Sequence, residues 1–243
     1  MSKSAFISGA SRGIGKGIAE VLASAGYNLA LCCVNNIDSL TEYASKLQKT
    51  FGIHAKAYKL DVSSLMDWEN ASSKIMANFG DIDVVINNAG ISYVGLITDM
   101  TPDDWRATIS TNLDSVFYST KAFLPKMINR KSGHIINISS MWGERGASCE
   151  VAYSTTKGGI NAFTKALAKE VAPSNISVNA IACGVIDTDM NSCFSQEEMS
   201  ELVDEIPVGR LGTPTEVGQL VLSILNSPSY MTGQIIGIDG GIC

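Results

Sequence analysis

The chain has 243 residues but only two histidines, His54 and His134, and no Cys-x-x-Cys pair. Neither histidine is spaced from another donor as zinc ligands are, so we expect no metal site. The sequence also lacks a hydrophobic run of the roughly 18–20 residues that cross a bilayer, and its first residues do not resemble a signal peptide. We therefore expect a cytoplasmic protein with no membrane partner.

Basic residues are in the minority, since 18 Lys and Arg against 24 Asp and Glu give a net charge of −6. Broad binding to nucleic acid needs a basic face, so nucleic acid is not an expected partner. Hydrophobic residues make up 45% of the chain and charged residues 17%, which excludes a disordered chain. Without an export signal, free thiols are favoured over disulfides at all six cysteines: Cys32, Cys33, Cys149, Cys183, Cys193 and Cys243.

Short apolar runs alternate with longer amphipathic stretches along the chain. The predicted strands cover residues 5–8, 29–34, 55–60, 84–86, 134–138, 177–181 and 234–238. The predicted helices cover residues 15–25, 39–51, 64–79, 102–129, 153–171 and 215–225. This alternation predicts an α/β fold, a doubly wound parallel sheet of about seven strands with helices on both faces. Ligands of such sheets bind beyond the carboxyl ends of the strands.

A glycine-rich turn, Gly9-Ala10-Ser11-Arg12-Gly13-Ile14-Gly15, follows the first predicted strand and opens the first helix. Glycines let the backbone turn tightly and let a pyrophosphate approach the N–H groups at the helix start. The spacing differs from the commoner Gly-x-Gly-x-x-Gly, and a plain helix-capping turn is the alternative interpretation.

The second predicted strand ends in Cys32-Cys33-Val34-Asn35-Asn36, without the acid that usually holds the adenosine ribose of NAD(H). Arg12 lies inside the glycine turn, and its planar guanidinium suits a 2′-phosphate. We therefore predict NADP(H) rather than NAD(H). A solvated loop arginine is the alternative.

The segment Tyr153-Ser154-Thr155-Thr156-Lys157 stands at the start of a predicted helix. Residues four apart share a helix face, so the phenol and the ammonium can enter one pocket. A phenol has a pKa near 10, and a neighbouring ammonium is expected to lower that pKa toward neutrality. An ordinary helix surface is the alternative. Ser140 ends the fifth predicted strand on the same rim. Asn112 lies inside a predicted helix although asparagine is a poor helix former, which suggests a special role.

These residues give the chain a resemblance to the classical short-chain dehydrogenase/reductases over essentially its whole length. It is most similar to the bacterial 3-oxoacyl-[acyl-carrier-protein] reductases. The matching elements are Gly9-x-x-x-Gly13-x-Gly15, Asp61-Val62, Asn87-Asn88-Ala89-Gly90, Asn112, Ser140, Tyr153-x-x-x-Lys157, Cys183-Gly184-Val185-Ile186-Asp187-Thr188 and Gly240-Gly241. The resemblance implies one Rossmann-type domain over residues 1–243 and a homotetramer. Cys183 departs from the family, which usually carries proline there.

The resemblance also implies residue roles. Tyr153 would be the general acid, Lys157 would lower its pKa and hold the nicotinamide ribose, Ser140 would orient the carbonyl, and Asn112 would hold a water. The implied cofactor-binding residues are Gly9, Ser11, Arg12, Gly13, Ile14, Gly15, Asp61, Val62, Asn87, Ala89, Gly90, Tyr153, Lys157, Ile186 and Thr188.

The first expectation for the substrate is a 3-oxoacyl group on acyl carrier protein, reduced in fatty acid synthesis. This acidic partner requires basic residues beside the active-site mouth. The resemblance places one docking position on Lys131, near Lys126 and Arg130, and a second on Ser174, where the family usually has arginine.

Other substrates and roles stay open. The segment 141–150 resembles that of reductases that act on an aminopentanone group of elongation factor P, and Glu144 or Glu150 would suit its amine. Trp142 would line an apolar pocket. A small free ketone or sugar is a further candidate substrate, and a non-catalytic cofactor-binding module is the alternative of another class. Residues 188–212 are expected to form a lid over the substrate.

Overall fold

The computed structural model describes residues 2–192 and 194–243. Seven strands form one parallel sheet in the order β3-β2-β1-β4-β5-β6-β7, which confirms the predicted fold. The strands are β1 (Ser4–Ile7), β2 (Asn28–Cys33), β3 (Ala55–Lys59), β4 (Val84–Asn87), β5 (Gly133–Ser140), β6 (Ile176–Cys183) and β7 (Ile235–Ile238). The five described cysteines are free thiols, and Cys193 lies outside the described residues.

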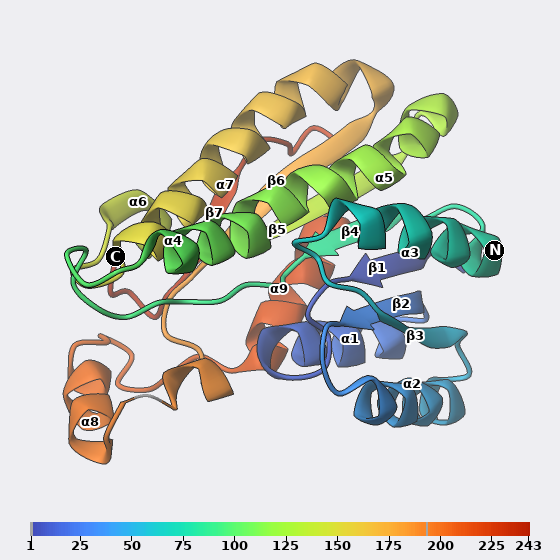
Figure 1. Cartoon of the computed structure of the whole chain (residues 1–243). Coiled ribbons are helices and arrows are strands. Elements are labelled where there is room, and N and C mark those ends of the chain that lie inside the picture. Colours follow the sequence, from blue (N-terminus) through green and yellow to red (C-terminus); the bar gives the residue numbers. More distant parts are fainter. Residues whose placement is uncertain (1, 193) are drawn as a thin grey trace.

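Helices cover both faces of the sheet (Figure 1). One face carries α1 (Gly13–Ser24), α2 (Ile37–Phe51) and α9 (Pro214–Leu225), and the other carries α3 (Leu65–Phe79), α5 (Ser115–Arg130) and α7 (Val151–Val171). The second face has an aromatic core in which Phe6 packs against Trp68 and Phe123, with ring centroids 5.4 and 5.1 Å apart. Burial of each such ring contributes on the order of 2–3 kcal/mol.

The strand order reverses between β1 and β4, because the chain builds the sheet outward from β1 in both directions. Sheets of this kind bind their ligands at such a switch point, beyond the carboxyl ends of the strands. The glycine turn follows β1, and the segment Asn88-Ala89-Gly90 follows β4. The topology therefore assembles the predicted motifs at one rim.

The helix predicted over 102–129 is instead three segments: α4 (Pro102–Ile109), a π-helical turn (Ser110–Asp114) and α5. The π turn surrounds Asn112, whose side chain bonds to another loop rather than to solvent. In this turn the Asn112 amide contacts Ile91 and Thr156. π-Helical turns inside α-helices are frequent at functional sites.

Other bounds differ from the prediction at the functional rim. Strands β5 and β6 extend to Ser140 and Cys183, which are paired in register. Helix α7 begins at Val151, so Tyr153 lies in its first turn. Short helices α6 (Trp142–Arg145) and α8 (Gln196–Asp204) were not among the predicted helices. Within the described ranges, none of the helices has the length and apolar character that a bilayer requires.

Candidate active site

The glycine turn is held against the loop after β4. Gly9 and Gly13 have φ values of 64° and 53°, a region that favours glycine. Asn88 Nδ2 donates to the carbonyl oxygens of Ser8 and Gly9 at 2.8 and 3.1 Å. A Cβ at Gly15 would collide with the Gly9 carbonyl oxygen and lie 2.5 Å from Asn88 Nδ2. Asn88 is therefore a positioning residue to which the sequence analysis gave no role.

The start of α1 suits a phosphate. Arg12 occupies the N-cap position, its side chain makes no capping hydrogen bond, and no acidic residue lies in the first turn. The N–H groups of that turn and the positive end of the helix dipole favour an anion. A Cβ at Gly13 would lie 3.2 Å from Thr188 Cγ2, so glycine also lets the segment after β6 approach. Ser11 and Ile14 lie in the same turn, partly exposed, and the residues present fit the pyrophosphate of a dinucleotide.

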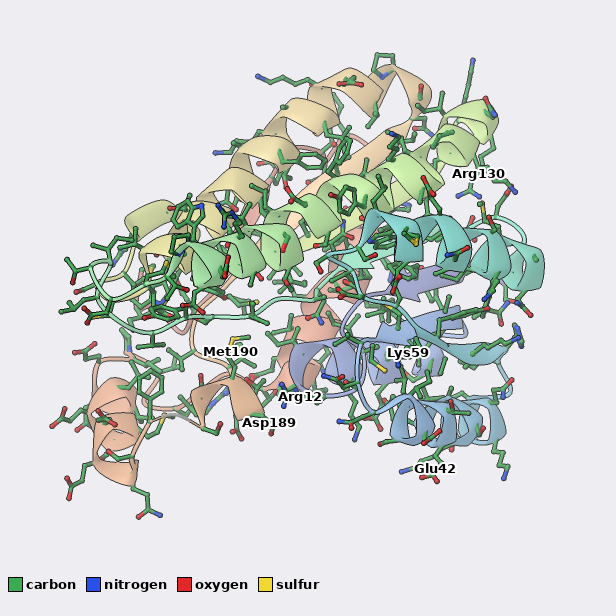
Figure 2. All side chains as sticks on the ribbon, in the orientation of Figure 1. Arg12, Glu42, Lys59, Arg130, Asp189 and Met190 are labelled. Atoms are coloured by element: carbon green, nitrogen blue, oxygen red, sulfur yellow. The ribbon has the colours of Figure 1, made fainter. Side chains whose placement is uncertain are left out.

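Two basic residues lie on this rim, one at the start of α1 and one at the end of β3. Arg12 Nη1 is 3.5 Å from Asp189 Oδ2, and both side chains are largely exposed, so this pair contributes little stability. Figure 2 shows the two side chains meeting between α1 and the segment after β6. Lys59 ends β3 in register with Cys33, is exposed, and pairs with no acid in the part of the chain described. Lys59 was not predicted from the sequence, although a basic residue at the end of a strand is a recognisable signal.

Three other predicted cofactor residues are engaged with the protein itself. Asp61 Oδ1 accepts hydrogen bonds from the backbone and hydroxyl of Ser63 at 2.9 and 2.7 Å. The Val62 carbonyl accepts one from Trp68 Nε1 at 2.9 Å. Asn87 Nδ2 donates 2.8 Å to Asn137 Oδ1 inside the core. The Asn87 side chain is therefore part of the core, and only the backbone of Asn87 is available at the rim.

The remaining predicted cofactor residues border the catalytic groups or the turn after β6. A Cβ at Gly90, which follows Ala89, would lie 3.3 Å from Asn112 Oδ1 and 3.8 Å from Lys157 Nζ. Ile186 is buried and forms an isolated parallel bridge with Gly212. The fold thus brings the β4 loop to the Lys157 ammonium.

Ser140, Tyr153 and Lys157 meet at the carboxyl end of β5. The Ser140 side chain lies close enough to the Tyr153 hydroxyl to lower its pKa, and Ser140 Oγ accepts a hydrogen bond from the Trp142 N–H at 3.2 Å. Lys157 Nζ lies 5.3 Å from the centroid of the Tyr153 ring and donates to the Ile138 carbonyl at 2.8 Å. The three side chains come from a strand end and the first two turns of α7, so two rigid elements set their geometry.

The pKa of Tyr153 is raised in this arrangement, so burial outweighs the lowering that was expected from Lys157. Burial favours the neutral phenol most, Cys183 and Glu150 add to the effect, and the Ser140 side chain opposes it. Burial also lowers the pKa of Lys157 to about 8. The ammonium stands over the ring face rather than at the hydroxyl oxygen, which leaves burial as the dominant influence.

Asn112 is fully buried and ties three segments together. Its Oδ1 accepts from the Ile91 N–H at 2.8 Å, and its Nδ2 donates to the Ile91 carbonyl at 2.9 Å and to Thr156 Oγ1 at 3.1 Å. Thr156 in turn donates to the Tyr153 carbonyl at 2.7 Å. The side chain therefore links the β4 loop to the first turn of α7.

Further polar contacts hold Lys157 from behind. Ser139 Oγ is 2.7 Å from Asn161 Oδ1 and 3.3 Å from the Lys157 carbonyl. A Cβ at Gly143 would lie 2.7 Å from the Lys157 carbonyl carbon, so α6 packs directly on this backbone. These supporting residues were not predicted, because their partners are distant in sequence.

Cys183 is buried beside the catalytic groups. Burial raises the pKa of its thiol to about 12, and Lys157 pulls that pKa the other way. The thiol is therefore neutral at physiological pH and acts as a small buried filler where the related family has proline.

The predicted docking residues do not lie beside the active-site mouth. Lys126, Arg130 and Lys131 precede β5, whereas Ser140 ends it, so they stand at the opposite end of the sheet. Lys126 and Arg130 pair with Asp81 at 3.4 and 3.6 Å, which offsets their charge (Figure 2 labels Arg130). The expectation that Lys126, Arg130 and Lys131 flank the active-site mouth is therefore wrong.

The fold and this site define an oxidoreductase that uses a nicotinamide cofactor. The chain belongs to the short-chain dehydrogenase family, whose profile matches residues 3–199. It is 44% identical over 242 residues to an uncharacterized oxidoreductase, YmfI, of Bacillus subtilis, covering 99% of each chain. It is 40% identical to the 3-oxoacyl-[acyl-carrier-protein] reductase FabG of Chlamydia muridarum, covering 100% of this chain and 98% of that one. It is 39% identical to an acetoacetyl-CoA reductase of Shinella zoogloeoides, covering 99% and 98%.

Proposed function

We propose that residues 1–243 form one NADP(H)-dependent reductase domain that converts a ketone to a secondary alcohol. The observation that carries this proposal is the position of Lys157 Nζ over the Tyr153 ring, 5.3 Å from its centroid, with Ser140 at the end of β5 acting on the Tyr153 hydroxyl. A reductase must deliver a proton to the carbonyl oxygen, and a buried neutral phenol is the protonation state that this step needs. The intact set argues against a non-catalytic module.

The cofactor, when bound, supplies the hydride. Ser140 donates a hydrogen bond to the substrate carbonyl and stabilises the charge that develops on its oxygen. Tyr153 protonates that oxygen, and the nearby Lys157 cation stabilises the phenolate left behind. Asn112 keeps the β4 loop and the start of α7 in register, and a water held there would return the proton.

NADP(H) is our proposal for the cofactor. Strand β2 ends without an acid, and Arg12 and Lys59 supply cationic groups at the adenosine end. Two cations beside a ribose favour a 2′-phosphate over a free hydroxyl.

The first candidate substrate is a 3-oxoacyl group on acyl carrier protein, supported by the names of several relatives. A carboxylate close to Tyr153 favours a second candidate, the aminopentanone group on elongation factor P. The position of the basic residues away from the mouth weakens the first candidate and leaves the second untouched.

NADPH oxidation measured with a substrate panel tests the proposal. The panel contains acetoacetyl thioesters on coenzyme A and on acyl carrier protein, the modified elongation factor, and simple ketones. We expect reduction of at least one of these ketones. Failure with every member, by protein that binds NADPH, would contradict the assignment as a reductase.

We also propose that residues 188–212 close over the substrate and that the chain forms a homotetramer. Helix α8 buries none of its residues and stands apart from the sheet (Figure 1), as a lid does. Phe117 on α5 is 50% exposed, and β7 forms an edge of the sheet. Exposed aromatic side chains and open strand edges suit association between copies.

A further inference from the structure

Glu150 is the acidic side chain that the fold places at the catalytic tyrosine. It immediately precedes α7, three residues before Tyr153, and its charge acts on the Tyr153 hydroxyl. Sequence analysis left Glu144 and Glu150 as equal candidates. The structure separates them, because Glu144 is exposed on α6, whereas Glu150 is partly buried and its charge raises the pKa of Tyr153.

One hydrogen bond holds the Glu150 carboxylate, and a second holds the backbone of the residue before it. Its Oε1 accepts a hydrogen bond from Ser92 Oγ at 2.5 Å. The preceding residue, Cys149, has a φ of 63° and accepts a hydrogen bond from the Gly95 N–H at 2.8 Å. Cys149 is thus held in a left-handed conformation that a side chain rarely adopts, and such strain persists where the surroundings enforce it.

This carboxylate lacks the partners that usually justify a partly buried charge. It occupies the N-cap position of α7 but makes no capping hydrogen bond. Across residues 2–192 and 194–243, no lysine or arginine lies within 4.0 Å of it. Lys157 donates instead to the Ile138 carbonyl. A carboxylate with one hydroxyl donor still has acceptor capacity for a cation.

We propose that Glu150, positioned by Ser92, binds a protonated amine on the ketone substrate. This inference rests on the proposed reductase function and narrows its substrate class to ketones that carry an ammonium group. A substrate ammonium would complete the charge pair that the protein leaves open, and a charge-assisted hydrogen bond fixes its orientation.

The same contact would aid the chemistry. Glu150 raises the pKa of Tyr153, which makes the phenol a weaker acid. An ammonium beside Glu150 offsets that charge, so an amine-bearing ketone improves the proton donor as it binds. We therefore expect an effect on kcat as well as on KM, which a purely anchoring contact would not give.

The test compares Glu150→Gln with the wild type on two matched ketones, one with a terminal amine and one with a methyl group in its place. Glutamine keeps the oxygen that accepts from Ser92 but removes the charge. We expect kcat/KM for the amine-bearing ketone to fall on the order of tenfold to 100-fold, while that for the neutral ketone stays equal or rises. Glu144→Gln is the matched control and is expected to change neither.

Ser92→Ala separates recognition from a structural role. If Glu150 only ties the β4 loop to α7, Ser92→Ala lowers the activity on the amine-bearing and the neutral ketone equally, and Glu150→Gln changes neither activity. That result would overturn the proposal. Equal losses on both ketones in Glu150→Gln also overturn it. A wild type that reduces the neutral ketone as well as the amine-bearing one rejects the inference but keeps the reductase. No reduction of either, or of any panel ketone, rejects the reductase itself.

The amine can belong to a small molecule or to a modified protein side chain. Comparing a free aminoketone with the aminopentanone group on elongation factor P distinguishes these sources. If the reduction of either ketone depends on Glu150, the result supports a cation-binding role for Glu150.

Discussion

The ammonium nitrogen of Lys157 lies 5.3 Å from the centroid of the Tyr153 ring while it donates 2.8 Å to the Ile138 carbonyl. The strand that ends in Ser140 therefore also holds the lysine. Because β5 and α7 are rigid elements, the hydroxyl pair and the cation keep one relative position. A cation over a ring face is attracted by the ring. This contact therefore stabilises the charged form of Lys157 and holds its side chain against Tyr153.

Removing the phenol oxygen tests the proton donor. Tyr153→Phe is expected to lower kcat for ketone reduction by at least about 100-fold, since general acid catalysis contributes at this level. NADPH binding, followed by fluorescence titration, should be nearly unchanged. Tyr230→Phe, on a side chain that is 99% exposed, is the matched control. A Tyr153→Phe variant with wild-type kcat would contradict the mechanism.

The pH profile reports the state of Lys157. Burial lowers its pKa from 10.5 to about 8, so the ammonium is lost as pH rises through about 8. The raised pKa of Tyr153 keeps the phenol protonated through the same range. We expect kcat/KM for reduction to decline above pH about 8. A flat profile up to pH 10 would argue against a role for the ammonium.

Protein stability should follow the same group. Below pH 8, folding has to bury the Lys157 ammonium, which lowers the free energy of unfolding. Between pH 8 and 10.5 Lys157 is neutral in the folded protein but still protonated in the unfolded chain, so the free energy of unfolding rises with pH. Relative to Lys157→Met, the wild type should gain up to about 3 kcal/mol in free energy of unfolding over that range. Urea titrations at several pH values measure this difference. Lys165→Met, on the exposed side of α7, should show no such trend.

Cofactor choice depends on Arg12 and Lys59. We expect Arg12→Gln and Lys59→Gln each to raise the Kd for NADPH by several-fold to about tenfold, with little change for NADH. Titration with 2′-phosphorylated and unphosphorylated adenosine fragments isolates the effect from catalysis. Lys56→Gln is the control, because Lys56 lies on the same strand but donates to Asn78 at 3.0 Å. Equal loss for both cofactors would point to general binding instead.

The close approach of the two loops makes Gly15 hard to replace. In Gly15→Ala the new Cβ meets the Gly9 carbonyl and Asn88 Nδ2, so the turn has to open. We expect a loss of about 1–3 kcal/mol in free energy of unfolding and weaker NADPH binding. At Gly237 the nearest atom to a Cβ is 3.9 Å away, so Gly237→Ala should cost little. Equal stability of the two variants would refute the steric argument.

Much of this protein follows from local sequence pattern. The alternation of apolar runs and amphipathic stretches determined the parallel sheet and its helical layers, since burial on both faces requires it. The glycine spacing determined where the backbone turns sharply. The Tyr153–Lys157 spacing determined that both side chains share one helix face.

Tertiary structure decided what these groups can do. Asn112 sits in a π turn because its amide bonds to Ile91, a residue far away in sequence. The pKa of Tyr153 rises because burial excludes water from the phenol, and Cys183 and Glu150 add to this effect. The Glu150 carboxylate is held at the start of α7 by Ser92, which comes from the loop after β4. Spacing along the chain specifies which residues share an element, whereas burial and charge proximity arise only when distant elements pack together.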